Sequence, residues 1–209
     1  MKDTPLIGVL ALQGGVSEHI RMLEDLGAST RPVRRTEHLD GLDGLVFPGG
    51  ESTTMSKLLE LGGMLHPLRE RISAGLPCLG TCAGLILLAS EVLDTRPDAH
   101  CLDALDVTVR RNAFGRQVDS FETDLEVSGV TDGGPAVHAV FIRAPWVEQA
   151  GEGVEVLSRV NDDGPAHGAV VAVRQGPVLG LSFHPELTGD ARLHRYFLGM
   201  VDDHRADRT

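Results

Sequence analysis

The first half of the sequence alternates short apolar runs with segments of helical periodicity. The apolar runs cover Leu6–Leu12, Gly44–Phe47 and Pro77–Gly80, and each is followed by a turn that contains glycine. Short runs of this kind are typical of strands that are buried on both faces of a sheet. Parallel strands need long crossover connections, which are usually helical. The alternation therefore predicts an α/β protein with a mostly parallel central sheet and helices on both faces.

Helical spacing of apolar residues fills the gaps between these runs. We expect helices over Ser17–Leu26, Ser52–Leu61, Leu65–Ala74 and Leu85–Val92. A glycine directly follows each of the first two segments, and glycine adopts the left-handed conformation of a helix C-cap without strain. Ser52 is expected to cap the second helix.

The second half carries a different pattern. Its strand-like segments are Leu105–Val109, Phe121–Val127, Val137–Ile142, Val154–Val160, Ala169–Val173 and Val178–Phe183. Turns rich in Gly, Pro and Asp separate them, which favours antiparallel strands added at one side of the sheet. Asp190 is expected to cap a last helix that ends at about Val201. No shift in composition marks a linker, so we expect residues 1–209 to form one domain, with residues 202–209 as a frayed tail.

Charge and cysteine content narrow the classes of function. The 209 residues carry a formal net charge of -11, which argues against nucleic acid as a general partner. Three cysteines without regular spacing do not form a disulfide framework and suit a reducing compartment. No segment approaches the ~20 apolar residues of a transmembrane helix. We therefore expect a cytoplasmic protein that does not engage a membrane.

The segment Gly80–Gly84 is the strongest local signal for chemistry. It has the form G-x-C-x-G between a predicted strand and a predicted helix, the design of the G-x-S-x-G nucleophile elbow. Such a tight turn leaves room only for glycine beside the nucleophile. The N-terminus of the following helix favours the thiolate, which is the reactive form of cysteine. Cys82 is therefore the candidate nucleophile, and a small buried cysteine in a glycine-flanked turn is the alternative.

His184 and Glu186 form the second signal, directly after the apolar segment that ends at Phe183. A thiol nucleophile needs a base, and the base needs an acceptor that orients it. His184 can take the thiol proton, and Glu186 can hold the other ring nitrogen. Because both motifs follow strands, we expect them at the same carboxyl edge of the sheet. An ordinary surface His and Glu after a strand is the alternative.

The loop Phe47–Thr54 is the third signal. Its two glycines follow a strand and let backbone N–H groups face a ligand. A tetrahedral intermediate on Cys82 needs such donors for its oxyanion, and we assign them to the N–H groups of Gly50 and Ala83. A tight loop before a Ser-capped helix fits the same residues. A phosphate cradle is disfavoured, because no G-K-[ST] follows.

With these motifs in place, the sequence resembles the class I glutamine amidotransferases. More narrowly, it is similar to the glutaminase subunits of ribose-phosphate-dependent pyridoxal 5'-phosphate synthases. The matching stretches are Ile7–Gly14, Phe47–Met55, Gly80–Ile86, Arg111–Glu122, Val140–Pro145 and Ser182–Thr188. The stretch Arg111–Glu122 is the most specific, since the cysteine and His-Pro-Glu motifs alone fit many amidotransferases.

The resemblance implies a flavodoxin-like three-layer α/β sandwich and hydrolysis of L-glutamine to L-glutamate and ammonia. It also implies a partner, a (β/α)8 synthase subunit in a hetero-oligomer, which uses the ammonia to make pyridoxal 5'-phosphate. Neither a metal nor an organic cofactor is expected for the glutaminase reaction. The family's contacts to glutamine fall here on Gly50, Glu51, Ser52, Arg111, Ile142 and Arg143. Arginine can hold the α-carboxylate of glutamine through two hydrogen bonds, although either arginine alone could be a surface ion-pair partner.

Three other functions remain open from the sequence. One is an amidotransferase of another pathway, such as histidine biosynthesis, and a second is a Cys-His peptidase or γ-glutamyl hydrolase on the same scaffold. The stretch Arg111–Glu122 argues against both. The third is a non-catalytic binding subunit, which the intact set of Cys82, His184 and Glu186 disfavours.

Overall fold

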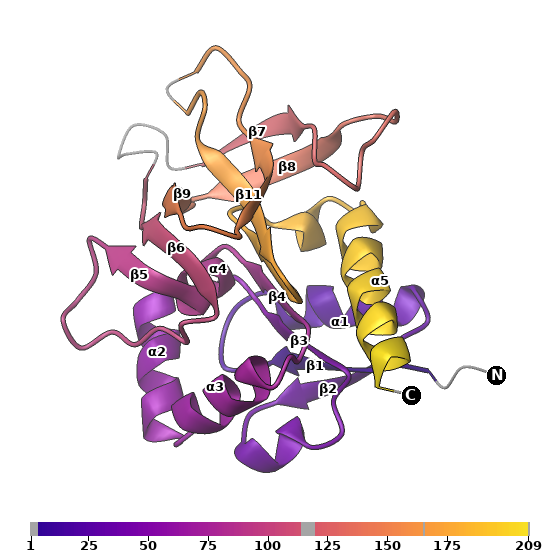
Figure 1. Cartoon of the computed structure of the whole chain (residues 1–209). Helices are drawn as coiled ribbons and strands as arrows, with labels where there is room; N and C mark the ends of the chain where they lie inside the picture. The colour runs from indigo at the N-terminus through magenta and orange to yellow at the C-terminus, as the bar shows by residue number, and fades with distance from the viewer. Residues whose placement is uncertain (1–3, 114–119, 165, 209) are drawn as a thin grey trace.

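The computed structural model describes residues 4–113, 120–164 and 166–208 (Figure 1). One sheet has ten strands, ordered β2-β1-β3-β4-β12-β11-β9-β6-β5, with β10 paired to β11. Its strands are β1 (Leu6–Leu10), β2 (Ser29–Val33), β3 (Gly44–Phe47), β4 (Cys78–Thr81), β5 (Ala89–Leu93), β6 (Leu105–Arg110), β9 (Trp146–Ala150), β10 (Glu155–Arg159), β11 (Val170–Gln175) and β12 (Val178–Leu181). A separate antiparallel ribbon joins β7 (Ser120–Leu125) to β8 (Val137–Ile142).

The helices are α1 (Val16–Asp25), α2 (Ser52–Leu61), α3 (Leu65–Ser73), α4 (Ala83–Leu88) and α5 (Arg192–Asp207). Two short 3-10 turns, η1 (Thr36–Leu39) and η2 (Pro185–Leu187), complete the described elements.

Strand directions divide the sheet into two parts. Neighbouring strands from β2 to β12 run parallel, whereas β11, β9 and β6 each run antiparallel to the strand before them in the sheet order. The prediction of a mostly parallel sheet with added antiparallel strands is therefore confirmed. The strand β12 belongs to the parallel part, although the sequence pattern placed it among the added strands.

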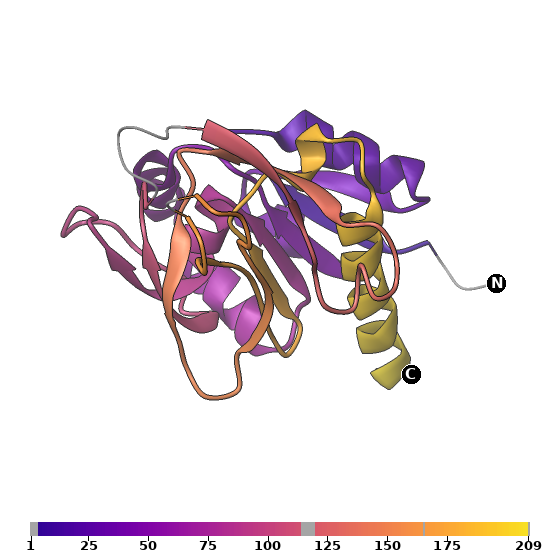
Figure 2. The same ribbon diagram turned by 90° about the horizontal axis from the view of Figure 1, so that it is seen from above.

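Helices lie on both faces of the sheet (Figures 1 and 2), and each face carries its own apolar core. One core contains buried residues of α2, α3 and α4, such as Met55, Leu68 and Leu85. The other contains residues of α1 and α5, such as Leu23 and Phe197, together with apolar side chains of the β7–β8 ribbon. Helices therefore cover both faces, and the ribbon extends the cover over the second face towards the carboxyl ends of the parallel strands.

The register of the central strands brings their carboxyl ends level. Gly80 of β4 is paired with Phe47 of β3 on one side and with Gly180 of β12 on the other. Each of these strands ends one residue later at most, so the chain leaves all three at one edge of the sheet. This edge receives the Pro-Gly-Gly loop, the cysteine elbow and the histidine segment.

Several predicted boundaries differ from the structure. The helix expected over Leu85–Val92 is α4, which already ends at Leu88, and the strand β5 follows at once. Glu51, and not Ser52, caps α2, because its carboxylate accepts the N–H groups of Thr53 and Thr54. The last helix continues to Asp207 instead of ending near Val201. The strands β2 and β9 had no predicted counterpart.

Within the described ranges, no helix has the length and apolar character that crossing a membrane requires.

Candidate active site

The cysteine elbow has the strained geometry that its glycines predict. Cys82 has φ 49° and ψ -106°, a backbone conformation that residues other than glycine rarely adopt. A methyl group on Gly84 would collide with the carbonyl oxygen of Phe47, and one on Gly80 would lie 2.7 Å from the carbonyl carbon of Gly84. Both flanking positions therefore need glycine, and the surrounding backbone holds Cys82 at the start of α4.

His184 and Glu186 leave the sheet beside this elbow. The N–H of Cys82 donates to the carbonyl of Leu181, so the residues that follow β12 start next to the cysteine (2.8 Å). Nδ1 of His184 lies 2.8 Å from Oε1 of Glu186. An ionised carboxylate only accepts hydrogen bonds, so Nδ1 carries the proton and Nε2 is left for the thiol. The Glu186 side chain is buried, which fixes this pair in place.

Cys82 and His184 meet over Gly49. A methyl group on Gly49 would clash with Cε1 of His184 and would lie 3.4 Å from Cβ of Cys82. Burial lowers the pKa of His184, but hydrogen bonds and charges from Cys82 and Glu186 outweigh this effect and raise the pKa to about 10. A histidine with such a pKa is an imidazolium at neutral pH, and the partner that stabilises it best is a thiolate.

Backbone carbonyl groups of β8 contact the same two residues. The backbone N–H of His184 donates to the carbonyl of Val140 (2.9 Å). Sγ of Cys82 lies 3.9 Å from the carbonyl oxygen of Ile142. The β7–β8 ribbon therefore forms one wall of the site, and it places Ile142 in contact with the nucleophile.

Replacing Gly49 by Ala is expected to lower kcat about a hundredfold, because the added methyl group must push the imidazole away from Cys82. Gly199→Ala is the matched control, since nothing lies within 4 Å of a methyl group there. Steady-state assays of the glutamine hydrolysis that the family resemblance implies, with circular dichroism to check folding, measure the effect in both variants. A Gly49→Ala enzyme with the kcat of the Gly199→Ala enzyme would mean that the imidazole does not occupy this position during turnover.

Glu51 and Arg111 form an ion pair next to the Pro-Gly-Gly loop. Nη2 of Arg111 donates to Oε1 of Glu51 (2.9 Å). Partial burial raises the pKa of Glu51, but hydrogen bonds from Thr53 and Thr54 lower it to about 2. Both groups are therefore charged at neutral pH, and only 16% of the Arg111 side chain is exposed. A free amino acid carries the complementary charges: its α-ammonium group is the counterpart of Glu51, and its α-carboxylate is the counterpart of Arg111.

The segments that carry Arg111 and Arg143 run side by side. The N–H of Ala113 donates to the carbonyl of Ala144 (3.1 Å). Arg143 is exposed and has φ 43°, so the chain makes a strained turn directly after Ile142. Part of the specific stretch Arg111–Glu122, residues 114–119, lies outside the described residues. The predicted substrate residues that are described thus lie on the Pro-Gly-Gly loop and the start of α2, on the chain after β6, and at the end of β8.

The structure adds three polar residues that the sequence pattern did not identify. His19 of α1, Thr81 of β4 and His194 of α5 are fully buried beneath Glu186. His19 lies four residues before the core residue Leu23, on the same face of the helix. That spacing was the available signal, because a polar residue on a buried helix face needs a buried partner.

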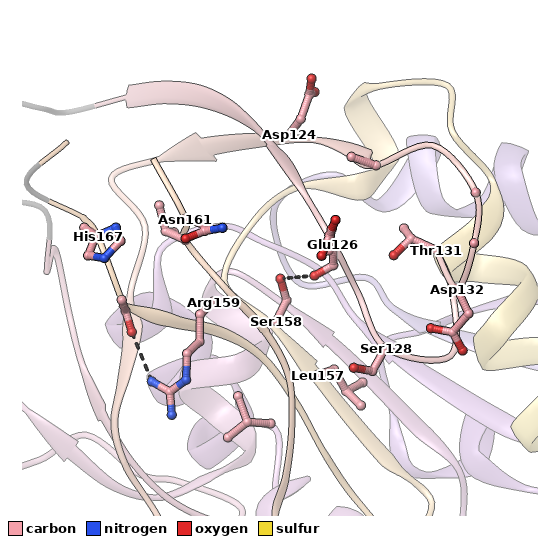
Figure 3. Close-up of a pocket in the computed structure, with 16 residues that line it drawn as sticks. Asp124, Glu126, Ser128, Thr131, Asp132, Leu157, Ser158, Arg159, Asn161 and His167 are labelled. Atoms are coloured by element: carbon pink, nitrogen blue, oxygen red, sulfur yellow. Dashed lines mark hydrogen bonds between the residues drawn. The ribbon is translucent and has the colours of Figure 1, made fainter. Parts of the chain in front are cut away.

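The other two cysteines and a large surface hollow lie apart from these residues. Burial raises the pKa of the Cys78 thiol and of the Cys101 thiol, which keeps both protonated. A hollow of about 1020 Å³ lies between β7, β10 and the loop after β7, and Figure 3 shows the acidic side chains Asp124 and Glu126 on its wall. None of its lining residues belongs to the Cys-His-Glu set. Among the described residues, no cluster of His, Cys, Asp or Glu is arranged to hold a metal ion.

Comparison with known proteins agrees with this geometry. A crystal structure described as a glutamine amidotransferase superposes with a TM-score of 0.84 at 51% identity, covering 94% of this chain and 98% of that one. Two proteins named pyridoxal 5'-phosphate synthase subunit PdxT are also similar. The one from Corynebacterium jeikeium strain K411 is 66% identical over 196 residues, which is 94% of this chain and 96% of the relative. The one from Nocardia farcinica strain IFM 10152 is 63% identical over 197 residues, which is 94% and 86%.

The model of the SNO glutamine amidotransferase family matches residues 9–203, nearly the whole chain. This match includes the Pro-Gly-Gly loop, the cysteine elbow and the histidine segment, and the fold resembles a glutamine amidotransferase structure across its length. The chain therefore belongs to the SNO glutamine amidotransferase family.

Proposed function

We propose that this protein is the glutaminase subunit of a pyridoxal 5'-phosphate synthase. It hydrolyses L-glutamine to L-glutamate and ammonia, and it passes the ammonia to a (β/α)8 synthase subunit in a hetero-oligomer. The observation that carries the proposal is the joint position of Cys82 and His184 over Gly49, with Glu186 bound to the far side of the imidazole. The names of relatives above 60% identity support the choice of pathway.

The catalytic cycle follows from the roles of three side chains. The thiolate of Cys82 attacks the amide carbon of glutamine and forms a tetrahedral intermediate. The N–H groups of Gly50 and Ala83 hold its oxyanion. His184 gives its proton to the departing ammonia, which leaves a γ-glutamyl thioester on sulfur. His184 then takes a proton from water, the water attacks the thioester, and glutamate leaves while Glu186 keeps the imidazole oriented.

The substrate residues provide complementary charges for the ends of glutamine. Arg111 and Arg143 can bind the α-carboxylate, and Glu51 can bind the α-ammonium group. Gly50, Ser52 and Ile142 then line the path of the side-chain amide to Cys82. Because Glu51 and Arg111 already pair with each other, their side chains are held in place before glutamine binds.

Replacing Arg111 by Ala is expected to raise KM for glutamine by about tenfold to a hundredfold, with a smaller change in kcat, because a charge-assisted hydrogen bond to bound substrate is lost. Arg110→Ala is the matched control. Arg110 is the next residue along the chain, and its side chain pairs with Asp94 and Glu148. Initial rates over a range of glutamine concentrations separate the two parameters. Equal KM values for the two variants would remove Arg111 from the substrate site.

A complex with the synthase subunit has a chemical reason. Ammonia is protonated in bulk water at neutral pH, and ammonium is not a nucleophile. Direct transfer between subunits keeps the molecule reactive. We also propose that this chain works in the cytoplasm, and its three free thiols fit a reducing compartment.

Transfer of labelled nitrogen tests the pathway. The chain is mixed with the candidate synthase subunit, ribose 5-phosphate, glyceraldehyde 3-phosphate and glutamine labelled with 15N at the side-chain amide. We expect 15N in the pyridoxal 5'-phosphate formed, and no label when Cys82→Ala replaces the wild-type chain. Hydrolysis of glutamine without label in the product would retain the glutaminase activity and reject the pathway.

A further inference from the structure

A buried chain of polar groups continues from Glu186 into the core. Nε2 of His19 lies 3.5 Å from Oε2 of Glu186 and 3.2 Å from Oγ1 of Thr81. Nδ1 of His19 lies 2.8 Å from Nε2 of His194. All four residues are at most 7% exposed. Three elements that are distant in sequence, α1, β4 and α5, thus meet behind the carboxylate that orients His184.

The charge state of the two histidines follows from their surroundings. Burial lowers the pKa of His19 to about 3 against the opposing charge of Glu186, and burial lowers the pKa of His194 to about 4. The titratable groups that face His19 are Glu186, His194 and His184. Both buried rings are therefore neutral at neutral pH, so each carries one ring proton.

The position of these two protons is decided by the neighbours of each ring. If Nδ1 of His19 carried the proton, the lone pair on its Nε2 would face the carboxylate of Glu186. His194 would then accept at Nε2 and bury its own Nδ1–H, which has no hydrogen-bond partner among the described residues. The opposite arrangement leaves only a bare acceptor at Nδ1 of His194, and a buried acceptor without a partner is tolerated better than a buried donor. Both rings therefore carry their proton on Nε2.

Packing of α1 brings this donor close to the carboxylate. A methyl group on Gly15, the residue before α1, would lie 3.1 Å from Oε1 of Glu186. The helix starts at Val16, and the N–H of His19 donates to the carbonyl of Gly15 (3.2 Å). The first turn of α1 thus approaches the carboxylate closely, and His19 is placed by the same turn.

We propose that His19 is a positioning residue for the triad, whose Nε2–H holds the second oxygen of Glu186 while His194 fixes the ring tautomer. The proposal rests on the proposed role of Glu186 in the glutaminase reaction. The chain of donors runs from His194 to His19, and from His19 to Glu186, which also accepts from His184. Oε2 of Glu186 is buried and has no other hydrogen-bond partner among the described residues, and hydrogen bonds in ligand-free active sites are commonly as long as this 3.5 Å contact.

Nitrogen NMR of the wild-type protein tests the arrangement of protons directly. The full chain is labelled with 15N-histidine, and the ring nitrogens of His19 and His194 are assigned by comparison with His19→Gln and His194→Gln. We expect both rings to be neutral at pH 7 with the proton on Nε2. A proton on Nδ1 of His19 would overturn the proposal, because that ring could not donate to Glu186.

Kinetics of two His19 variants test the effect on catalysis, using the full chain together with its synthase subunit. His19→Leu removes the donor and is expected to lower kcat about tenfold to a hundredfold, with little change in KM. The pH–kcat profile of this variant should differ from that of the wild type, because the carboxylate that orients His184 has lost a hydrogen-bond donor. His19→Gln places an N–H near the original Nε2 and should restore most of kcat.

Leu23→Ala is the control for stability, since Leu23 is buried on the same face of α1 and carries no polar group. It should unfold at lower temperature and keep the wild-type pH profile. A His19→Leu enzyme with wild-type kcat and pH profile would overturn the proposal, as would a His19→Gln enzyme no better than His19→Leu. Failure of the glutaminase assignment is distinguishable, because the wild-type chain and Cys82→Ala would then release glutamate at the same rate, whatever happens at His19.

Discussion

Replacing Cys82 by Ala is expected to lower glutaminase kcat by roughly ten-thousand-fold or more, because no other group in the site can form the thioester. The expectation depends on the elbow, which holds Cys82 in a conformation with φ 49° and leaves space only for glycine on either side. The variant should stay folded, since Ala fits wherever the cysteine Cβ already lies. Glutamate release measured under saturating glutamine gives the effect.

Cys101→Ala is the matched control for this variant. Cys101 is only partly buried, and burial raises the pKa of its thiol, so its removal should leave kcat unchanged. Activity of Cys82→Ala equal to that of Cys101→Ala would end the catalytic account and leave a binding subunit on an amidotransferase scaffold.

Replacing Glu186 by Gln should lower kcat about a thousandfold to ten-thousand-fold. The amide can donate as well as accept, so it no longer selects the tautomer with the proton on Nδ1 of His184. Burial alone would lower the pKa of His184, and the hydrogen bond and charge of Glu186 help to raise it to about 10. Without that charge the imidazolium is lost at lower pH, so the alkaline limb of the pH–kcat profile should move down.

The raised pKa of His184 also makes the stability of the fold depend on pH. The pKa of His184 in the folded protein lies above its ordinary value of 6.5, so protonation stabilises the fold fully below that pH. The contribution is lost as pH rises through about 10. Glu148→Gln is the control for the kinetics of Glu186→Gln. The carboxylate of Glu148, on β9, pairs with Arg110 on β6 and lies outside the Cys-His-Glu set. An alkaline limb in Glu186→Gln that matches the one in Glu148→Gln would show that Glu186 does not act on His184.

The parts of the site that the sequence predicted are those in which one steric condition decides the structure. Gly80 and Gly84 are needed because a side chain at either position would strike backbone atoms, and this requirement identifies the elbow between them. Buried parallel strands end at a common edge, so two motifs that follow strands meet there without any information on distant contacts. The positions of Cys82 and His184 follow from these two rules.

Other features depend on contacts that a sequence pattern does not contain. The run from Leu85 to Leu88 is buried on every side, and its periodicity gives no sign that the chain changes from α4 to β5 after it. The strand β2 contains Pro32 and four other residues of mixed polarity, a pattern that is typical of a loop. It is a strand here because it pairs with β1 at the sheet edge, where proline is tolerated. The cap of α2 is Glu51 and not the predicted Ser52, because the carboxylate of Glu51 can accept from the N–H groups of Thr53 and Thr54 and from Arg111 at once.

The polar chain behind Glu186 shows the same limit. His19 and His194 lie 175 residues apart in sequence, and each alone looks like one polar residue on an amphipathic helix. Only the packing of α1 and α5 on one face of the sheet reveals that the two rings are within hydrogen-bond distance of each other and that His19 faces the carboxylate. Local patterns therefore predicted the candidate nucleophile and its base, and the three-dimensional structure located the groups that contact them.

The most direct test of the account is the site at which an electrophilic analogue of glutamine reacts. A diazoketone that replaces the side-chain amide alkylates a thiolate only where the analogue binds and a neighbouring acid protonates it. Peptide mass spectrometry after complete inactivation should find the adduct on Cys82 alone, with Cys78 and Cys101 unmodified, and excess glutamine should prevent the reaction. Inactivation with Cys82 unmodified, or with the label on either other cysteine, would contradict the account.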